Sequence, residues 1–455
     1  MYGGAIVSAD RPSIIIVHCH DLGQHLNCYG VRTVQSPNLD AFAQEGVRFE
    51  NSFCTAPSCS PSRASIFTGR YPHSNGMMGL AHADFGWDLH PSERHLAQHL
   101  SDAGYATTAV GVIHETASNA ARCGYDEHLP PGMAAQAADA AIEALRAARE
   151  RPTPFFFSVG FVEPHRLPYP ASEGRPEGDH GFPGPHLTPD DALGVQVPPY
   201  LKDTEGARRE LAGLQGAVKH IDAQFGRIVV AVDELGLRQN TLVIFTADHG
   251  IAMPRAKCSL YDPGIRVPFI LRLPSRARWS GGHTLRPMIS NVDYVPTLLD
   301  LVGAPVPLNI QGRSLAPLLD GEDYAPRDAI FAEMTYHDYY DPRRCIRTAT
   351  HKLIANFTTA PFFMDPSQSR RPLSDTVVPV NSATAYHDHI EVYDLVDDPW
   401  EQRDVSEEPR YGDVRHELNR RLYEHLAASD DPILEGAVTS PHHRRTQELL
   451  RQAAV

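Results

Sequence analysis

Four short apolar runs in the sequence each stop just before a histidine or an aspartate–histidine pair. They are rich in β-branched and aromatic residues, as strands buried on both faces of a parallel sheet are. The runs are 14–17, followed by His20 and Asp21; 105–112, followed by His114; 155–159, followed by His165; and 242–245, followed by Asp248 and His249. In open parallel sheets, ligands bind at the carboxyl ends of the strands. The sequence therefore predicts an α/β fold with one shared site at that edge.

The stretches between these runs have the pattern of helices and loops. Helices are expected at 37–45, 133–149, 206–235 and 292–302. Residues 166–203 are dense in proline and glycine, so we expect a long surface loop there and a candidate lid. Alternation of strands and helices predicts a mostly parallel central sheet flanked by helices.

A change of composition near residues 321–328 divides the chain. We predict a catalytic α/β domain over 1–325 and a smaller C-terminal α+β domain over 326–455, which contributes to the pocket rim. The smaller domain is expected to hold an antiparallel sheet, with an irregular stretch at 358–388 and no clear pattern after Asp430. Its expected strands are 329–333, 345–350, 352–357 and 391–395, and its helix carries a stripe of Val414, Leu418, Leu422 and Leu426.

The charge and cysteine content limit the classes of function. A formal net charge of -15 argues against a nucleic-acid or anionic-membrane surface, so an anionic substrate must meet a local cluster of Arg, Lys and His. Seven cysteines without paired spacing argue against a disulfide framework. Residues 1–12 lack the pattern of a signal peptide, and no apolar segment is long enough to span a bilayer. The default expectation is a soluble, cytoplasmic protein.

Residues 59–63, Cys-Ser-Pro-Ser-Arg, have the pattern of a helix start. Proline is tolerated in the first turn of a helix, because the N–H that it lacks would have no partner there. Cys59 then lies at the positive end of the helix dipole, one turn from Arg63, whose guanidinium suits a sulfate or phosphate oxygen. A buried structural cysteine is the alternative interpretation.

This run, continued to Thr-Gly-Arg at 68–70, resembles the signature of the type I sulfatases, a formylglycine-dependent family of the alkaline phosphatase superfamily. The resemblance implies that Cys59 is oxidised after translation to formylglycine, an aldehyde whose hydrate is the nucleophile. It also implies a formylglycine-generating enzyme as the partner in maturation. The activity implied is hydrolysis of a sulfate ester or an N-sulfate.

The metal site implied by the resemblance departs from the family pattern at one position. His20-Asp21-Leu22-Gly23 stands where the family has Asp-Asp-x-Gly, and Asp248-His249-Gly250 matches the second metal pair. One divalent cation is implied, held by His20, Asp21, Asp248, His249 and the side chain at position 59. The family ion is Ca²⁺, but two nitrogen ligands shift the preference toward Mn²⁺ or Zn²⁺. A merely structural imidazole is the alternative for His20.

Three further residues match catalytic positions of the family. His114 lies where sulfatases carry Gly-Lys-x-His, although Val112 replaces the lysine. His165 matches the histidine that protonates the leaving group, and an unperturbed imidazole would titrate near neutral pH. Lys257 aligns with a sulfate-binding lysine, and Arg63 would lower the cost of an alkoxide at position 59. The alternatives are a core histidine at 114 and a solvated lysine at 257.

Within sulfatases the sequence is most similar to the heparan N-sulfatase (sulfamidase) branch. The similarity lies in residues 73–80, 251–254, 333–336, 340–344 and 392–399. It implies a sulfated amino sugar or other small sulfated compound as substrate. Residues that would then reach the pocket rim, with a solvated face as the alternative, are Glu333, Tyr336, His337, Arg343 and Arg344.

Two other functions remain open from the sequence. Phosphodiester and phosphonate monoester hydrolases of the same superfamily share formylglycine and a histidine-containing metal site, and His20, His249 and Val112 favour them slightly. A catalytically idle protein that binds sulfated glycans is the other alternative, which an intact Cys59 disfavours. No nucleic-acid or membrane partner is expected, and the sequence leaves open whether the chain forms a homo-oligomer.

Overall fold

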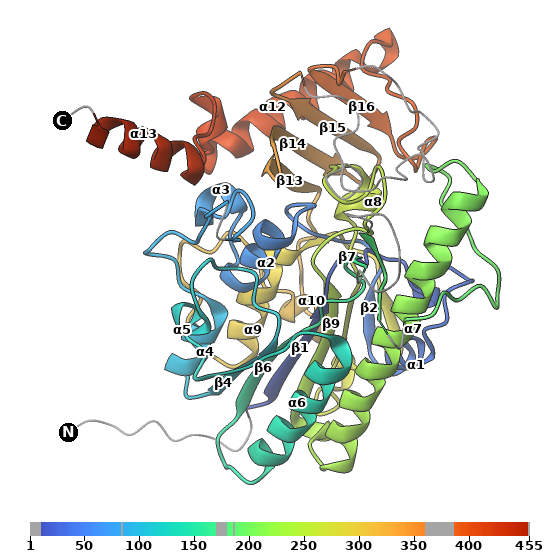
Figure 1. The fold of residues 1–455 in the computed structure, drawn as a ribbon, viewed down its shortest axis with the longest axis vertical. Helices are drawn as coiled ribbons and strands as arrows, with labels where there is room; N and C mark the ends of the chain where they lie inside the picture. Colours follow the sequence, from blue (N-terminus) through green and yellow to red (C-terminus); the bar gives the residue numbers. More distant parts are fainter. Residues whose placement is uncertain (1–10, 83–84, 170–179, 185–186, 360–385, 454–455) are drawn as a thin grey trace.

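The computed structural model describes residues 11–82, 85–169, 180–184, 187–359 and 386–453. An eight-stranded sheet lies at its centre with helices on both faces, and a four-stranded sheet lies above it in Figure 1. The strands of the central sheet, in spatial order, are β11 (His283–Leu285), β2 (Val47–Phe49), β10 (Phe269–Arg272), β9 (Thr241–Ala247), β1 (Ser13–Cys19), β6 (Phe155–Gly160), β4 (Ala106–Gly111) and β5 (Glu127–Leu129).

The four strands predicted from the sequence are neighbours, in the order β9-β1-β6-β4. β1 is parallel to both of the strands beside it, with Ile15 opposite Val243 in β9 and Phe157 in β6. β6 is in turn parallel to β4. All four strands therefore end at the same edge of the sheet, and the predicted mostly parallel α/β sheet is confirmed.

β10 runs antiparallel to both of its neighbours, β9 and β2. After β9 the chain crosses the carboxyl edge of the sheet, forms the short helix α8 (Asp262–Ile265) and returns directly to the sheet. An antiparallel neighbour needs no crossover helix, so residues 248–268 stay at this edge instead of passing behind the sheet.

The C-terminal part contains a second, antiparallel sheet. Its strands are β13 (Ala329–Tyr336), β14 (Tyr340–Thr348), β15 (His351–Asn356) and β16 (Ile390–Asp394). Helix α12 (Gly412–Ala428) buries Leu418, Leu422 and Leu426 against it, as the predicted stripe requires. β14 begins at Tyr340, five residues before the predicted strand 345–350. The prediction missed this part because its charged side chains suggest an exposed segment, whereas the structure buries them. The predicted domain boundary lies just before β13 and stays a prediction.

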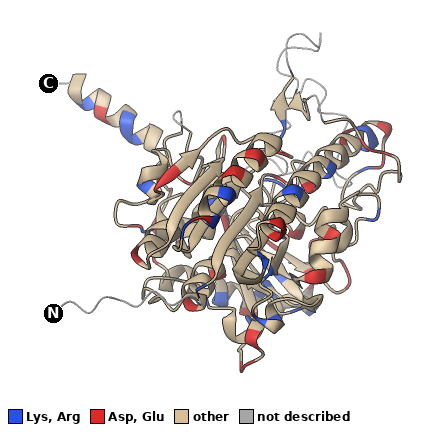
Figure 2. Ribbon diagram, turned by 90° about the horizontal axis from the view of Figure 1, so that it is seen from below, with Lys and Arg blue, Asp and Glu red and all other residues tan. Residues whose placement is uncertain are grey.

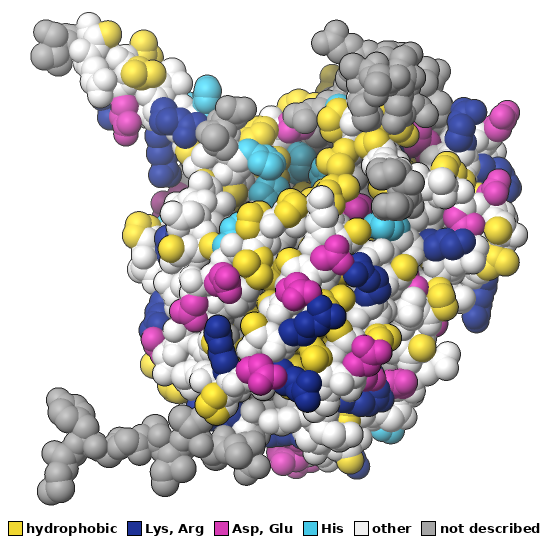
Figure 3. Space-filling view, turned by 60° about the horizontal axis from the view of Figure 1, so that its bottom comes forward, with side chains coloured by type: hydrophobic (Ala, Val, Ile, Leu, Met, Phe, Trp, Pro, Cys, Tyr) yellow, Lys and Arg dark blue, Asp and Glu magenta, His cyan; other side chains and the backbone are white. Residues whose placement is uncertain are grey.

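After α12 the chain forms helix α13 (Pro441–Ala453), for which the sequence gave no clear pattern. This helix stands away from the rest of the molecule, as Figures 2 and 3 show from two directions. None of its residues is buried.

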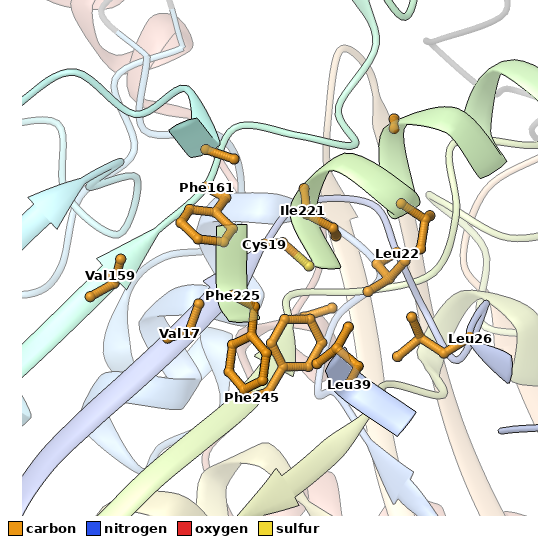
Figure 4. Packing of buried hydrophobic residues seen from close by; sticks show 14 of the residues in the cluster. Val17, Cys19, Leu22, Leu26, Leu39, Val159, Phe161, Ile221, Phe225 and Phe245 are labelled. Atoms are coloured by element: carbon orange, nitrogen blue, oxygen red, sulfur yellow. The ribbon is translucent and has the colours of Figure 1, made fainter. Parts of the chain in front are cut away.

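The strands of the central sheet bury both faces. Ile15, Val17 and Cys19 face one hydrophobic core, part of which is shown in Figure 4, whereas Ile14 and Ile16 face the other. Burial on both faces explains why β1 is apolar at every position from Ile14 to Val17. The first core is covered by α1 (Pro37–Glu45), α6 (Ala134–Arg149) and α7 (Glu205–Glu234), and the second by α2 (Cys59–Thr68), α4 (Leu96–Asp102), α5 (Ala120–Cys123), α9 (Tyr294–Leu301) and α10 (Ala316–Asp320).

Several expectations fall partly outside the described residues. Of the expected loop 166–203, the structure describes two short paired strands, β7 (Leu167–Pro168) and β8 (His180–Gly181), and the segments around them. The lid stays a prediction, and most of 1–12 and 358–388 lies outside the described residues. Short elements elsewhere are α3 (Pro72–Asn75), β3 (Ser52–Phe53) and β12 (Ile289–Ser290). Within the described ranges, no helix combines the length and apolar character needed to cross a membrane.

Candidate active site

Helix α2 begins at Cys59, the position at which the sequence predicts a helix start. Its cap residue Ser58 is extended, Pro61 lies in the first turn, and Gly69 ends the helix with φ +68°. All ten residues of the helix are buried. Cys59 and Arg63 are therefore one turn apart on a rigid, enclosed element, with the amino end of the helix at position 59.

Side chains from the ends of β1 and β9 meet Cys59 at this point. His249 Nε2 lies 3.3 Å from Cys59 Sγ, 3.3 Å from Asp21 Oδ1 and 3.6 Å from Asp248 Oδ1. His20 Nδ1 lies 3.0 Å from Asp248 Oδ2. Ligand atoms of His20, Asp21, Cys59 and Asp248 all lie within 4.8 Å of one another. The structure thus brings together all five residues predicted to hold a metal.

The donor set fits a divalent cation. His20 Nδ1 is buried and close to Asp248, but it has no hydrogen-bond partner with suitable geometry. Burial, and then the charge of Arg63, lowers the pKa of His20, so the imidazole keeps a free lone pair. Burial alone would raise the pKa of Asp248, but the charges of His249, His20 and Arg63 lower it well below its usual value. Anionic oxygens and neutral imidazole nitrogens around one point are suitable metal ligands.

Lys257 joins the metal residues to His165. Its Nζ donates hydrogen bonds to Asp21 Oδ1 at 3.0 Å and Oδ2 at 2.9 Å, and it lies 3.2 Å from His165 Nε2. His165 Nδ1 lies 2.6 Å from the carbonyl oxygen of Arg166, to which it donates. His165 is therefore a neutral imidazole with its proton on Nδ1 and its Nε2 lone pair turned to Lys257.

This arrangement corrects one expectation from the sequence. An unperturbed His165 would titrate near neutral pH, but burial and then the positive charge of Lys257 lower the pKa of His165 to about 3. The proton at this side of the site is carried by Lys257, since the carboxylate of Asp21 raises the pKa of that ammonium despite its burial.

Arg63 connects α2 to both strand ends. Its Nε lies 3.2 Å from Asp248 Oδ2, and its Nη1 donates to His18 Nδ1 at 2.6 Å. Its buried Nη2 has no hydrogen-bond partner among the described residues. His18, which the sequence analysis did not single out, donates through Nε2 to Ser158 Oγ at 2.9 Å. The sequence does hint at His18, because it lies in β1 two residues before the predicted ligand His20, which follows the strand.

His114 lies beside His20, with a ring-centroid separation of 5.8 Å. Its Nε2 is 3.1 Å from Nε2 of His82, a second residue that the sequence analysis missed. The backbone N–H of His114 donates to Glu115 Oε2 at 2.9 Å, and burial lowers the pKa of His114 well below its usual value. Val112 is placed against Gly132, which precedes α6. Figure 3 shows histidine side chains gathered in a hollow of the surface on this side of the molecule.

The five residues predicted at the pocket rim do not form a solvated face. Glu333 accepts hydrogen bonds from His73, and Arg343 is paired with Asp341. Arg344 is paired with Asp431, and the hydroxyl of Tyr336 donates to the carbonyl oxygen of Val438.

His337 differs from the other four in its neighbours. Burial is the main cause that lowers the pKa of His337, and the contact with Asp338 opposes it. The charges of Lys257 and His249 lower the pKa further. His337 is therefore close enough to Lys257 and His249 for their charges to act on it.

The profile of the sulfatase family matches residues 12–304, and a profile described as N-sulphoglucosamine sulphohydrolase, C-terminal, matches residues 254–365. Human N-sulphoglucosamine sulphohydrolase is 28% identical to this chain, covering 93% of it and 91% of the human protein. An ulvan-active sulfatase of Formosa agariphila is 24% identical, covering 95% of this chain and 83% of its own.

Solved structures share the fold at lower identity. A protein crystallised with its substrate D-glucosamine-2-N,6-O-disulfate has a TM-score of 0.68 and 21% identity, over 92% of this chain and 98% of that one. The phosphonate monoester hydrolase of Agrobacterium radiobacter has a TM-score of 0.69 and 21% identity, over 92% and 96%. At 21% identity, each of these similarities shows a shared fold alone. They therefore do not separate sulfate from phosphonate chemistry.

Proposed function

The chain belongs to the sulfatase family, and we propose that within this family it removes the sulfate group of an N-sulfated or O-sulfated amino sugar. As a sulfatase it is a hydrolase of sulfate esters or N-sulfates. The observation that carries the proposal is the convergence of Cys59 with His20, Asp21, Asp248 and His249. The preference for an amino sugar is supported by the similarity to N-sulphoglucosamine sulphohydrolase over nearly the whole chain.

Sulfatases generally use a metal ion, and His20, Asp21, Asp248 and His249 are the residues that would hold it here. When bound, a divalent cation acts as a Lewis acid on the sulfate oxygens and on the hydroxyl at position 59. We favour Mn²⁺ or Zn²⁺ over Ca²⁺, because two of these four ligands are imidazole nitrogens.

Cys59 is the residue that a formylglycine-generating enzyme would oxidise. Formylglycine, in its hydrated form, supplies the hydroxyl that attacks sulfur. Burial raises the pKa of the unmodified Cys59 thiol well above its usual value, so the thiol itself is a poor nucleophile. The Nη2 group of Arg63, buried and without a partner, is a donor for an anionic oxygen near position 59.

The remaining residues bind sulfate and move a proton. Lys257, beside Asp21, and His114, beside His20, hold the sulfate oxygens. The departing amine or alcohol takes its proton directly from Lys257 Nζ as negative charge develops on the leaving atom, and His165 Nε2, 3.2 Å away, orients that ammonium. His114, paired with His82, accepts the proton that is released when sulfate departs.

Turnover of three substrates by protein co-expressed with a formylglycine-generating enzyme tests the proposal. We expect sulfate release from N-sulfoglucosamine and from an aryl sulfate, and slower cleavage of an aryl phosphodiester. A Cys59→Ala variant should fold and show no turnover, whereas Cys28→Ala, at a thiol away from the site, should be as active as the wild type. Faster phosphodiester than sulfate cleavage would favour the phosphonate-type alternative, and turnover by Cys59→Ala would overturn the mechanism.

A further inference from the structure

Helix α13 leaves an apolar stripe in solvent. Leu449 and Leu450 are 66% and 67% exposed, and no residue of the helix is buried. At helical spacing, Thr446 and Ala453 lie on the side of these leucines, whereas Arg444, Glu448 and Arg451 lie on the opposite side. The helix is therefore amphipathic, and the described part of the chain leaves its apolar side exposed.

Residues 438–453 form a C-terminal arm, and its contacts with the rest of the described residues lie near its beginning. Tyr340 and Tyr336 bind the N–H and the carbonyl oxygen of Val438, just before the helix. Arg445 lies against Gly86, and Arg444 is close enough to His90 to add to the lowering of its pKa, which is mainly due to burial. The leucines lie further along, where the helix projects outward in Figures 1 and 2.

A free helix of this length is not expected to be stable by itself. Its 13 residues span about 20 Å, and isolated helices shorter than about 12–15 residues are marginal in water. Tertiary packing of the apolar side normally provides the missing stability. The apolar stripe of α13 thus indicates a partner surface.

The charge of the helix indicates what kind of surface this is. Three arginines and one glutamate give α13 a net charge of +2. Because the whole chain carries −15, the rest of it carries −17. A second copy of this chain offers both an acidic body for the arginines and apolar side chains for the leucines. A sulfated glycan would cover the arginines only, and an anionic membrane would repel the acidic body.

We propose that α13 docks onto a second copy of this chain, so that two copies exchange their C-terminal helices in a symmetric dimer. In such a dimer each copy supplies the same surface, and each helix is covered by its partner. The association combines burial of Leu449 and Leu450 with attraction between the basic arm and the acidic body.

Sedimentation equilibrium over the micromolar range tests the dimer with the full-length protein. The wild type should be dimeric, and Leu449→Gln/Leu450→Gln, which keeps the charge of the helix, should raise the dissociation constant by about 100-fold or more. Arg444→Glu/Arg451→Glu should weaken the dimer most at low salt. The matched control Gln447→Ala/Gln452→Ala changes two polar residues of the same helix and should leave the dimer intact.

Each remaining outcome would overturn the proposal. A monomeric wild type would do so, as would a Leu449→Gln/Leu450→Gln variant that dimerises as tightly as the wild type. If the wild type is monomeric but its arm is needed for retention on a sulfated dextran or on anionic phospholipid vesicles, the occupant is a glycan or a lipid surface instead. Turnover of an aryl sulfate and the thermal unfolding midpoint should be equal in all variants, which separates this test from that of the active site.

Discussion

The ammonium group of Lys257 donates to both carboxylate oxygens of Asp21, at 3.0 and 2.9 Å, inside the protein. Burial opposes the charge on each partner, but their attraction prevails, so the pKa of Lys257 is raised and that of Asp21 is lowered. A positive charge is thereby fixed beside His165 across the neutral pH range. In the proposed mechanism the acid is therefore the ammonium of Lys257, with the neutral imidazole of His165 beside it.

Removing this charge should impair turnover more than folding. In Lys257→Met the buried carboxylate of Asp21 loses its counter-charge and the leaving group loses its proton donor, so we expect kcat to fall by about 100-fold or more. Lys257→Arg should retain part of the activity. Steady-state kinetics with an aryl sulfate measures the effect, with Lys202→Met as the control at an exposed lysine. An unchanged kcat in Lys257→Met would contradict the role.

The ligand at position 20 should decide which metal the protein retains. His20→Asp replaces a nitrogen ligand by a hard oxygen ligand, so we expect the purified protein to shift from Mn²⁺ or Zn²⁺ toward Ca²⁺. Elemental analysis after dialysis against all three ions measures the ratio. His283→Asp makes the same change at an exposed histidine and should leave the ratio as in the wild type. The same ratio in His20→Asp would show that His20 is not a ligand.

Arg344 should matter for stability and not for substrate affinity. Its guanidinium is 1% exposed and paired with Asp431 at 2.5 and 3.0 Å, so Arg344→Met leaves a buried carboxylate without its partner. We expect the free energy of unfolding to fall by about 3–5 kcal/mol, measured by urea denaturation. Arg420→Met breaks an exposed pair on α12 and should change it little. A higher KM with unchanged stability would instead support the substrate contact predicted from the sequence.

One buried histidine should make the fold sensitive to mild acid. Burial lowers the pKa of His25 to about 4, whereas an unfolded histidine titrates near 6.5. Between these values the unfolded chain binds a proton that the folded protein does not, so stability falls as pH decreases from about 6.5 to about 4. His25 should therefore cost the wild type about 1 kcal/mol of unfolding free energy between pH 7.5 and pH 5.5.

The His25→Gln variant isolates this contribution. It should lose less stability than the wild type over the same pH interval, in denaturant titrations at the two pH values. His283→Gln, at an exposed histidine, should keep the wild-type dependence on pH. Equal pH dependence of His25→Gln and the wild type would show that His25 takes up its proton in the folded state as well.

The sequence was sufficient to locate the site because its main residues follow strands. Asp21, His114, His165 and Asp248 come after runs whose apolar pattern already indicates a buried parallel sheet. Parallel neighbours must end at one edge, so the pattern predicted that these side chains meet, although it gave no order for the strands. The start of α2 was equally clear, since a proline in the first turn is a local signal.

What the sequence did not show depends on partners that are distant along the chain. His18 is tied to Ser158, 140 residues away, and Arg344 to Asp431, 87 residues away. The low pKa of His165 likewise comes from burial and from Lys257, 92 residues further on. Without such partners in view, a charged residue on β14 looks exposed and a histidine looks unperturbed. The antiparallel direction of β10 also had no local signal, because it depends on where the chain re-enters the sheet.

The enclosure of α2 sets the time at which position 59 can be altered. Cys59 is only 2% exposed, and every residue of its helix is covered by strands and loops from distant parts of the chain. A modifying enzyme could not bind this segment once those parts of the chain have packed around it. Under the proposed function, oxidation of the thiol would therefore belong to the interval between synthesis and closure, and a chain that folded before it was modified would stay inactive.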